Sequence, residues 1–330
     1  MSFKLLGVGS PLVDYSLTVS DEFLEHHVPG GKGCTRNITD SEKEAILRAA
    51  GKVFCRTPGG SAANTIRIFA ALGGHAALFG KSGDDDDGEF FRDALKKCGA
   101  DTTAVIPDGN FSTGYCLSLI TPDAERTMLS NLGASVQVEI GDLEYIDIRS
   151  FNFILMEGYL SGEKWFDRLI GDARRNGCRI ALDLNNYELV AKYRDRFLKT
   201  LDSGIDLLFA NSQEISQLFP DKKTTEIIAL LQKRIPVTVL KLGRDGALII
   251  TGKEVISIDA EKNIEVKDTT GAGDFFAAGF LYGLSKNAPL EICGRAGTLC
   301  AAAIISELGT SLTEEKANKL KNIIQKEVTQ

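Results

Sequence analysis

The second half of the chain alternates short apolar runs with amphipathic segments, and this alternation constrains the fold more than any other feature. Apolar runs occur at 151–159, 179–185, 206–212, 236–243 and 247–251. Helices are expected at 162–175, at about 187–201 and after 212. Strands that alternate with helices at this interval form βαβ units, whose parallel sheet is covered by helices on both faces. We therefore expect a doubly wound, mostly parallel α/β sheet without an internal repeat or linker.

The composition excludes several classes of function. The 330 residues carry a formal net charge of −7 and no block of Lys or Arg, so nucleic acid and anionic membranes are unsuitable partners. No basic leader precedes a long apolar run, and no apolar stretch approaches the length of a membrane span. The seven Cys form no CxxC pair. We expect a soluble, cytoplasmic protein with reduced thiols.

A glycine-rich turn near the C-terminal end carries the clearest chemical signal. A strand-like run at 264–268 leads into Gly271, Ala272 and Gly273, and the apolar residues after Asp274 recur at helical spacing. A ligand can approach such a backbone closely, and the first helical turn offers unpaired N–H groups and the positive end of the helix dipole. The pattern predicts an anion hole with one carboxylate, Asp274, inside it. A tight connection with an ordinary first-turn Asp is the alternative interpretation.

The helix end favours the ionised form of Asp274 by roughly 0.3–1 kcal/mol, which predicts a charged carboxylate and a weak base. A weak base suits phosphoryl transfer, in which catalysis consists mainly of positioning and charge stabilisation.

Two motifs resemble the signatures of the ribokinase-like sugar and nucleoside kinases, the PfkB family. DTTGAGDFFAAGF at 268–280 is similar to the C-terminal signature, and PGGSAAN at 58–64 is similar to the N-terminal one. The stretch TGYCLSLITPDAERTMLSNLGAS at 113–135 resembles the adenosine-kinase-like branch. The resemblance implies an ATP-dependent kinase that phosphorylates a hydroxymethyl group of a sugar or ribonucleoside, with ATP and Mg²⁺ as cofactors.

The resemblance also implies roles for individual residues. Asp274 would be the general base, and the amides of Gly271, Ala272 and Gly273 would stabilise the transferring phosphoryl group. The substrate would contact Asp14, Gly59, Gly60, Asn64 and Glu157. The nucleotide would contact Asn185, Asn211, Lys241, Gly243, Gly246 and Thr269. Glu214, in the sequence NSQE, would order water around Mg²⁺, and Asp268 and Thr270 match ligands of a monovalent cation, K⁺.

The resemblance divides the chain into two parts. Residues 1–14, 51–110 and 131–330 would form the α/β domain, and residues 15–50 and 111–130 would form a small, discontinuous β lid. Exposed lid strands can pair in this family, so a monomer and a homodimer are both compatible with the sequence.

The acceptor stays open at this point. Adenosine or a related nucleoside would need an apolar slot for its base, for which Phe111, Phe151 and Tyr159 are candidates, whereas free ribose or fructose would not. A non-catalytic sugar- or nucleotide-binding regulator on the same fold is the alternative from another class.

Three other motifs are rejected as functional signals. Gly80-Lys81-Ser82 resembles a phosphate-binding loop, but His75 stands where that motif requires glycine. The run GVGSPL at 7–12 lacks the third glycine of a dinucleotide fingerprint. The acidic run at 84–87 is typical of a solvated helix start rather than of a metal site.

Overall fold

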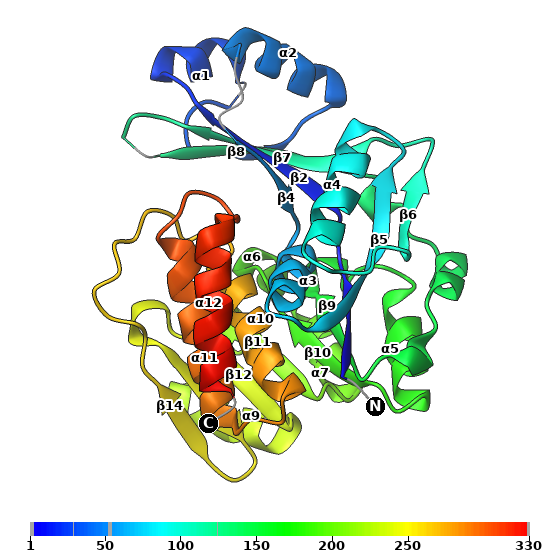
Figure 1. Ribbon diagram of the computed structural model, residues 1–330, viewed down its shortest axis with the longest axis vertical. Helices are drawn as coiled ribbons and strands as arrows, with labels where there is room; N and C mark the ends of the chain where they lie inside the picture. The colour runs from blue at the N-terminus through cyan, green and yellow to red at the C-terminus, as the bar shows by residue number, and fades with distance from the viewer. Residues whose placement is uncertain (1–2, 29, 52–54, 124, 329–330) are drawn as a thin grey trace.

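The computed structural model describes residues 3–28, 30–51, 55–123 and 125–328, and within them the strands form two sheets (Figure 1). The large sheet has nine strands in the order β14-β13-β12-β11-β10-β9-β1-β5-β6. The small sheet has five strands in the order β3-β8-β7-β2-β4 and lies at one end of the molecule, above the helices α3 and α10 in Figure 1.

The large sheet is parallel from β6 to β12 and ends in two antiparallel strands, β13 and β14. Its strands are β1 (Lys4–Val8), β5 (His75–Gly83), β6 (Val105–Asp108), β9 (Phe153–Glu157), β10 (Arg179–Asp183), β11 (Leu207–Asn211), β12 (Val237–Lys241), β13 (Ala247–Thr251) and β14 (Val255–Ile258). This arrangement confirms the doubly wound, mostly parallel α/β fold that the alternation predicted.

Helices cover both faces of the large sheet, because alternate side chains of each central strand point to opposite faces and nearly all are apolar. Leu5 and Ala181 belong to one buried core, while Leu6 and Leu182 belong to the other. The first core packs against α3 (Ser61–Ala71), α4 (Asp86–Lys97), α10 (Ala272–Ser285), α11 (Leu290–Ile305) and α12 (Glu314–Glu327). The second packs against α5 (Phe166–Arg175), α6 (Tyr187–Lys192), α7 (Arg194–Asp202), α8 (Ser212–Leu218) and α9 (Thr224–Arg234).

The small sheet and two helices form a separate layer, which is called the lid below. Its strands are β2 (Leu12–Thr18), β3 (Thr35–Asn37), β4 (Cys55–Gly59), β7 (Thr113–Ile120) and β8 (Arg126–Gly133). The helices α1 (Asp21–His27) and α2 (Asp40–Ala50) lie on the side of this sheet away from the large domain (Figure 1). Short 3₁₀ turns complete the chain at η1 (Ala134–Val136), η2 (Ile140–Tyr145), η3 (Ile148–Ser150), η4 (Gly158–Leu160) and η5 (Gly243–Asp245).

The strands of the small sheet extend beyond the segments assigned to the lid from the sequence. β4 pairs with β2, although its residues fall within 51–110, and Asp14 lies inside β2 rather than after a strand of the large sheet. The residues Thr57, Pro58 and Gly59 indicate a turn in the sequence because Pro and Gly are rare in strands. β4 is an edge strand, where Pro is tolerated.

Several local expectations differ from the structure. Residues 264–268 form no strand; there the backbone N–H of Lys267 donates to the Ile305 carbonyl at 2.8 Å. The segment expected as one helix at about 187–201 is two helices, α6 and α7, divided at Tyr193. Gly80-Lys81-Ser82 lies within β5 rather than in a turn, and Lys81 forms an ion pair with Asp142 at 2.8 Å.

The acidic run at 84–87 has structural roles. Asp85 caps α4, and Asp87 accepts a hydrogen bond from Lys43 of α2 at 2.8 Å. Among the described residues there is no cluster of three or more His, Cys, Asp or Glu that could hold a metal ion by itself. In the same part of the chain, no helix combines the length and the apolar character needed to cross a bilayer.

Candidate active site

Polar side chains gather at the carboxyl ends of the parallel strands, next to the first turn of α10. Asp183 ends β10, Asn211 ends β11 and Lys241 ends β12, so neighbouring strands deliver them to one edge of the sheet. Open α/β sheets bind their ligands at this edge. The lid sheet lies above the same region (Figure 1).

Asp274 is held by the first turn of α3. The Ser61 hydroxyl donates to Oδ1 of Asp274 at 2.6 Å, and Nδ2 of Asn64 donates to Oδ2 at 2.9 Å. The two sequence signatures therefore meet at a single carboxylate. Ser61 was not selected from the sequence, and its only signal was its place directly after the glycine pair.

The ionisation of Asp274 differs from the expectation. Burial raises the pKa of this carboxyl to about 7, although hydrogen bonds from Ser61 and Asn64 oppose the rise. Nearby Asp183 raises the pKa further and Lys241 lowers it. The favourable helix end is thus outweighed by the cost of burying a charge. Asp274 is a stronger base than a surface Asp and can take up a proton near neutral pH.

Asn185, expected at the nucleotide, contacts Ser61. Its Nδ2 donates to the Ser61 hydroxyl at 2.7 Å, and its Oδ1 accepts from the Gly158 N–H at 2.7 Å. The backbone of Asn185 has a φ of 63°, a left-handed conformation that Asn tolerates better than most residues. These contacts orient the hydroxyl toward Asp274.

Glu157, expected among the substrate contacts, binds backbone amides beside the site. Its side chain is buried, and its two carboxylate oxygens accept from the backbone N–H groups of Ser10, at 2.7 Å, and Ala62, at 3.1 Å. Burial raises its pKa. The carboxylate joins the loop after β1 to the start of α3, which keeps Ser61 and Asn64 in place.

Two cavities lie on either side of this region. The lid cavity, of about 110 Å³, lies between the lid and the large domain. The lid contributes Asp14, Ser16, Cys55, Thr57, Cys116, Ser118, Ile120, Arg126 and Met128, and the large domain contributes Asp268, Thr270, Leu308, Gly309 and Thr310. The body cavity, of about 450 Å³, lies against α10 and α11.

The body cavity has a polar end and apolar walls. Lys241, Gly243, Gly246, Thr269, Ala272 and Gly273 line it at the polar end. Ile264, Val266, Phe276, Ala301 and Ile305 form its apolar walls. Thr270 lines the lid cavity and Gly273 lines the body cavity, so the start of α10 joins the two.

The lid cavity brings Asp14 close to the glycine pair. A side chain at Gly59 would meet the Asp14 carboxyl at 2.4 Å, and one at Gly60 would meet the Ser10 carbonyl at 2.1 Å. Gly60 also has a φ of 91°, which favours glycine. Burial raises the pKa of Asp14 to about 6, while the positive charge of Arg67 lowers it.

The turn before α10 offers backbone donors. Gly271, the N-cap of α10, has a φ of 76°. The N–H of Ala272 donates to the Thr269 carbonyl at 3.2 Å, so this amide is partly engaged, contrary to the expectation that all three would be free. Within the described residues, the amides of Gly271 and Gly273 have no hydrogen-bond acceptor. A side chain on Gly273 would lie 3.0 Å from the Lys241 ammonium.

Glu214 and Asn211 form a capping box at the start of α8. The Glu214 carboxylate accepts from the Asn211 N–H and from Nδ2 of Asn211, each at 2.7 Å. Neither residue lines the body cavity. Burial raises the pKa of Glu214 to about 7, Lys241 lowers it and Asp183 raises it.

These residues fit Mg²⁺ held through water. The Lys241 ammonium pairs with Asp183 at 3.0 Å, and its charge also lowers the pKa values of Glu214 and Asp274, which burial raises. Three carboxylates around one ammonium leave negative charge that a divalent cation can balance. Mg²⁺ keeps several waters and usually takes few protein carboxylates, so no complete protein cage is required.

Asp268 and Thr270 do not fit a K⁺ site in this arrangement. Asp268 accepts from the backbone N–H groups of Thr270, at 2.7 Å, and Gly309, at 2.9 Å, and it pairs with Arg126 of β8 at 2.6 Å. Arg126 also donates to the Thr270 hydroxyl at 2.6 Å. A guanidinium therefore already supplies positive charge at these oxygens. Sequence reasoning missed Arg126, which lies in the lid.

None of the three aromatic residues considered for a base slot lines the lid cavity. Phe111 and Tyr159 are about half exposed, and Phe151 packs at the edge of the second core. The apolar residues at the lid cavity are instead Ile120 and Met128 of the lid and Leu308 of the large domain.

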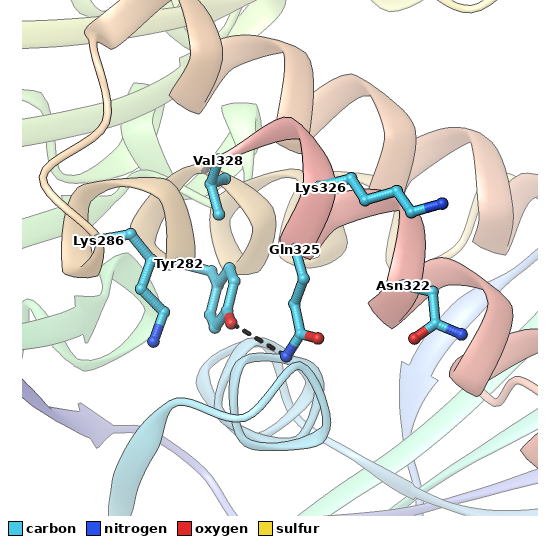
Figure 2. A pocket seen from close by; sticks show the side chains of 6 residues that line it. All are labelled: Tyr282, Lys286, Asn322, Gln325, Lys326 and Val328. Carbon is cyan, nitrogen blue, oxygen red and sulfur yellow. Dashed lines mark hydrogen bonds between the residues drawn. The ribbon is translucent and has the colours of Figure 1, made fainter. Parts of the chain in front are cut away.

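A larger depression, of about 700 Å³, lies at the other end of α10 (Figure 2). It is lined by Tyr282, Lys286, Asn322, Gln325, Lys326 and Val328, and the Gln325 amide donates to the Tyr282 hydroxyl at 3.4 Å. Asp274 starts α10 whereas Tyr282 and Lys286 lie at its end. This depression is therefore separate from the candidate active site.

Solved structures with the same fold cover nearly the whole chain. A probable sugar kinase from Rhizobium etli is 31% identical, with a TM-score of 0.85, and the match covers 98% of this chain and 99% of that one. The adenosine kinase from Sinorhizobium meliloti is 30% identical, also with a TM-score of 0.85, and the match covers 98% and 100%. The fold and the site place this protein in the class of sugar and nucleoside kinases.

The profile of the pfkB family carbohydrate kinases matches residues 36–317, and the chain belongs to this family. Among its relatives, the aminoimidazole riboside kinase of Salmonella typhimurium is 29% identical over 247 residues, which are 71% of this chain and 75% of that protein. The nucleoside kinase of Methanothermobacter thermautotrophicus is 27% identical over 307 residues, covering 93% and 90%. The protein is thus a phosphotransferase, and the alternative of a non-catalytic regulator has no support.

Proposed function

We propose that this kinase transfers the γ-phosphate of ATP to the hydroxymethyl group of a ribonucleoside, with Asp274 as the general base. The observation that carries the proposal is the position of Asp274. It is held by Ser61 and Asn64, and it directly follows Gly273, which lines the body cavity and whose amide has no acceptor among the described residues.

The proposed reaction follows from the groups around Asp274. The acceptor's hydroxymethyl group would lie against this carboxylate and lose its proton to it as the oxygen attacks the phosphorus in line. The Gly271 and Gly273 amides and the Lys241 ammonium would stabilise the charge on the transferring group. Bound Mg²⁺ would neutralise charge on the β- and γ-phosphates, and Glu214 and Asp183 would hold its waters.

The body cavity suits the nucleotide. Its apolar walls, Ile264, Val266 and Ile305 among them, can enclose a flat base, and its polar end at Lys241 and Gly273 can receive phosphates. Kinases of this family use ATP and normally Mg²⁺.

The lid cavity suits a ribose that carries a base. Asp14 can accept hydrogen bonds from sugar hydroxyls, and the small polar residues around it leave room for a sugar ring. At the same cavity Met128 of the lid and Leu308 of the large domain are 40% and 50% exposed. Two exposed apolar side chains from opposite walls favour a planar base between them. A free pentose or ketose is the second candidate, because the polar part of the cavity alone would accommodate it.

A substrate panel tests the proposal. ADP release is measured with Mg-ATP and with adenosine, other nucleosides, ribose or fructose, using Asp274→Asn as the inactive control. We expect turnover with one or more nucleosides, and we expect Met128→Asp to raise their KM without raising the KM for a free sugar. Turnover confined to free sugars would refute the nucleoside assignment, and full activity of Asp274→Asn would refute the role of the base.

A further inference from the structure

Arg67 is a buried cation to which the described part of the chain offers no ion-pair partner. Its side chain projects from α3 and is 6% exposed, and among the described residues no carboxylate lies within ion-pair distance of it. Its Nε atom is also buried without a hydrogen-bond partner. Burying a guanidinium in this way is costly unless its charge and its donors serve other groups. None of the roles described above uses this residue.

The guanidinium sets the orientation of Asn64. Nη2 of Arg67 donates to Oδ1 of Asn64 at 3.1 Å. A guanidinium has donors only, so it must face the oxygen of the amide rather than its nitrogen. The Nδ2 group of Asn64 is thereby directed to Asp274, to which it donates at 2.9 Å.

The same side chain holds one wall of the lid cavity. Nη1 of Arg67 donates to the Ser311 hydroxyl at 3.0 Å, and Nη2 also donates to the Thr310 carbonyl. Thr310 and its neighbours Leu308 and Gly309 line the lid cavity. Arg67 therefore connects the helix that holds Asp274 with the loop that borders the acceptor.

The positive charge of Arg67 acts on both carboxylates of the site. It lowers the pKa of Asp14; burial lowers the pKa of Arg67 itself, and the negative charges of Asp14 and Asp274 oppose that fall. The other charged groups that affect Asp274 are Asp183 and Lys241. Removal of Arg67 would therefore raise the pKa of Asp14 and of Asp274.

We propose that Arg67 is a positioning residue for the acceptor site, which orients Asn64 toward Asp274 and holds the loop at 308–311. The proposal rests on the proposed function for its catalytic consequence. The positioning role itself can be tested without measuring turnover.

The direct test is an NMR titration of the Asp274 carboxyl. Protein labelled with ¹³C at the Asp side-chain carboxyls is titrated, and the Asp274 signal is assigned from its loss in Asp274→Asn. We expect Arg67→Met to raise the pKa of Asp274, because Asn64 loses the orientation in which its Nδ2 donates to this carboxylate, and Arg67→Lys, which keeps a donor, to raise it less. An unchanged titration in Arg67→Met would overturn the proposal.

Kinetics provide the second readout. We expect Arg67→Met to move the acid limb of kcat/KM to higher pH and to lower kcat at its plateau about tenfold or more, because Asn64 loses its orientation. Arg67→Lys should return the acid limb of kcat/KM to its wild-type pH but should not restore the plateau value of kcat. A loss of melting temperature with both readouts unchanged would mean that Arg67 acts on folding alone.

Two matched variants complete the design. Arg234→Met removes an arginine that pairs with Asp202 on the far side of the large domain, and it should change neither the titration nor the kinetics. Ser311→Ala removes one of the two links to the loop, keeps the bond to the Thr310 carbonyl, and keeps the protein testable if Arg67→Met does not fold. It should raise the KM for the acceptor and leave the pKa of Asp274 unchanged, and an unchanged KM would overturn the role of the Ser311 contact. If the wild-type protein turns over no acceptor, the proposed function fails while the titration still decides the role of Arg67.

Discussion

Asp274→Asn should make this protein less active and more stable at once. Folding raises the pKa of Asp274 from 3.8 to about 7 through burial. The folded protein therefore holds this proton more tightly than the unfolded chain does, and stability falls as the pH rises from about 4 to about 7. Above about pH 7 the Asp274 carboxyl is ionised in both the folded and the unfolded chain, and the full free-energy cost of burying its charge lowers the stability. Asparagine removes the charge and keeps a similar shape.

The size of the effect follows from the shift. The rise from 3.8 to about 7 corresponds to about 4 kcal/mol. This is an upper limit, because the residue as a whole keeps an intermediate exposure to solvent, which screens the charge. We expect Asp274→Asn to be about 1–3 kcal/mol more stable than wild type at pH 8 and equally stable at pH 4. Its turnover should fall by about 10²–10⁴-fold, the usual contribution of a positioned base.

Urea unfolding at several pH values measures this difference. Trp165 is the only tryptophan and is 2% exposed, so its fluorescence reports on unfolding of the second core. Asp93→Asn, an exposed substitution on α4, is the matched control and should show no pH-dependent gain. The reasoning is refuted if the stability difference between Asp274→Asn and wild type is the same at pH 4 and pH 8.

Four further predictions concern the same site. The kcat/KM of wild type should rise with pH through an apparent pKa near 7, since Asp274 must lose its proton to act; a flat profile between pH 5.5 and 8.5 would contradict this. Ser61→Ala should lower kcat and raise the pKa of that limb, because Asp274 loses one hydrogen bond that favours its ionised form, and a profile identical to wild type would rule this out. Exchange of K⁺ for tetramethylammonium should leave turnover unchanged, because the Arg126 guanidinium occupies Asp268 and Thr270; a requirement for K⁺ in steady-state assays would show that Arg126 leaves them. Gly60→Ala should destabilise the protein by about 1–3 kcal/mol in urea unfolding, because Gly60 has a positive φ and a side chain there would meet the Ser10 carbonyl. A variant as stable as wild type would contradict this steric argument.

The sequence predicted the sheet more reliably than the lid. β9, β10, β11 and β12 are continuous apolar runs because both of their faces are buried, and such runs are readable from composition alone. β4 was not readable, since its Thr-Pro-Gly residues pair with β2 only because the edge of the small sheet tolerates them.

The residues of the site divide in the same way, into those that a local motif reveals and those whose role depends on distant partners. Asp274 was identified from the sequence because a glycine turn before a helix has a local signal. Asn64 and the glycines at 59 and 60 were found through their motif. The roles of Ser61, Arg67 and Arg126 depend on partners 213, 243 and 144 residues away, to which no local pattern points.

The sequence by itself determined the class of fold, the family and the carboxylate at the centre of the site, because periodicity, glycine turns and short motifs are local properties of a chain. Only the tertiary structure decided how basic that carboxylate is and which donors hold it. It also decided that Glu157 binds backbone amides and that Arg126 occupies Asp268 and Thr270. Burial, charge and hydrogen bonding depend on which distant segments meet, and those encounters exist only once the sheet, the helices and the lid have packed together.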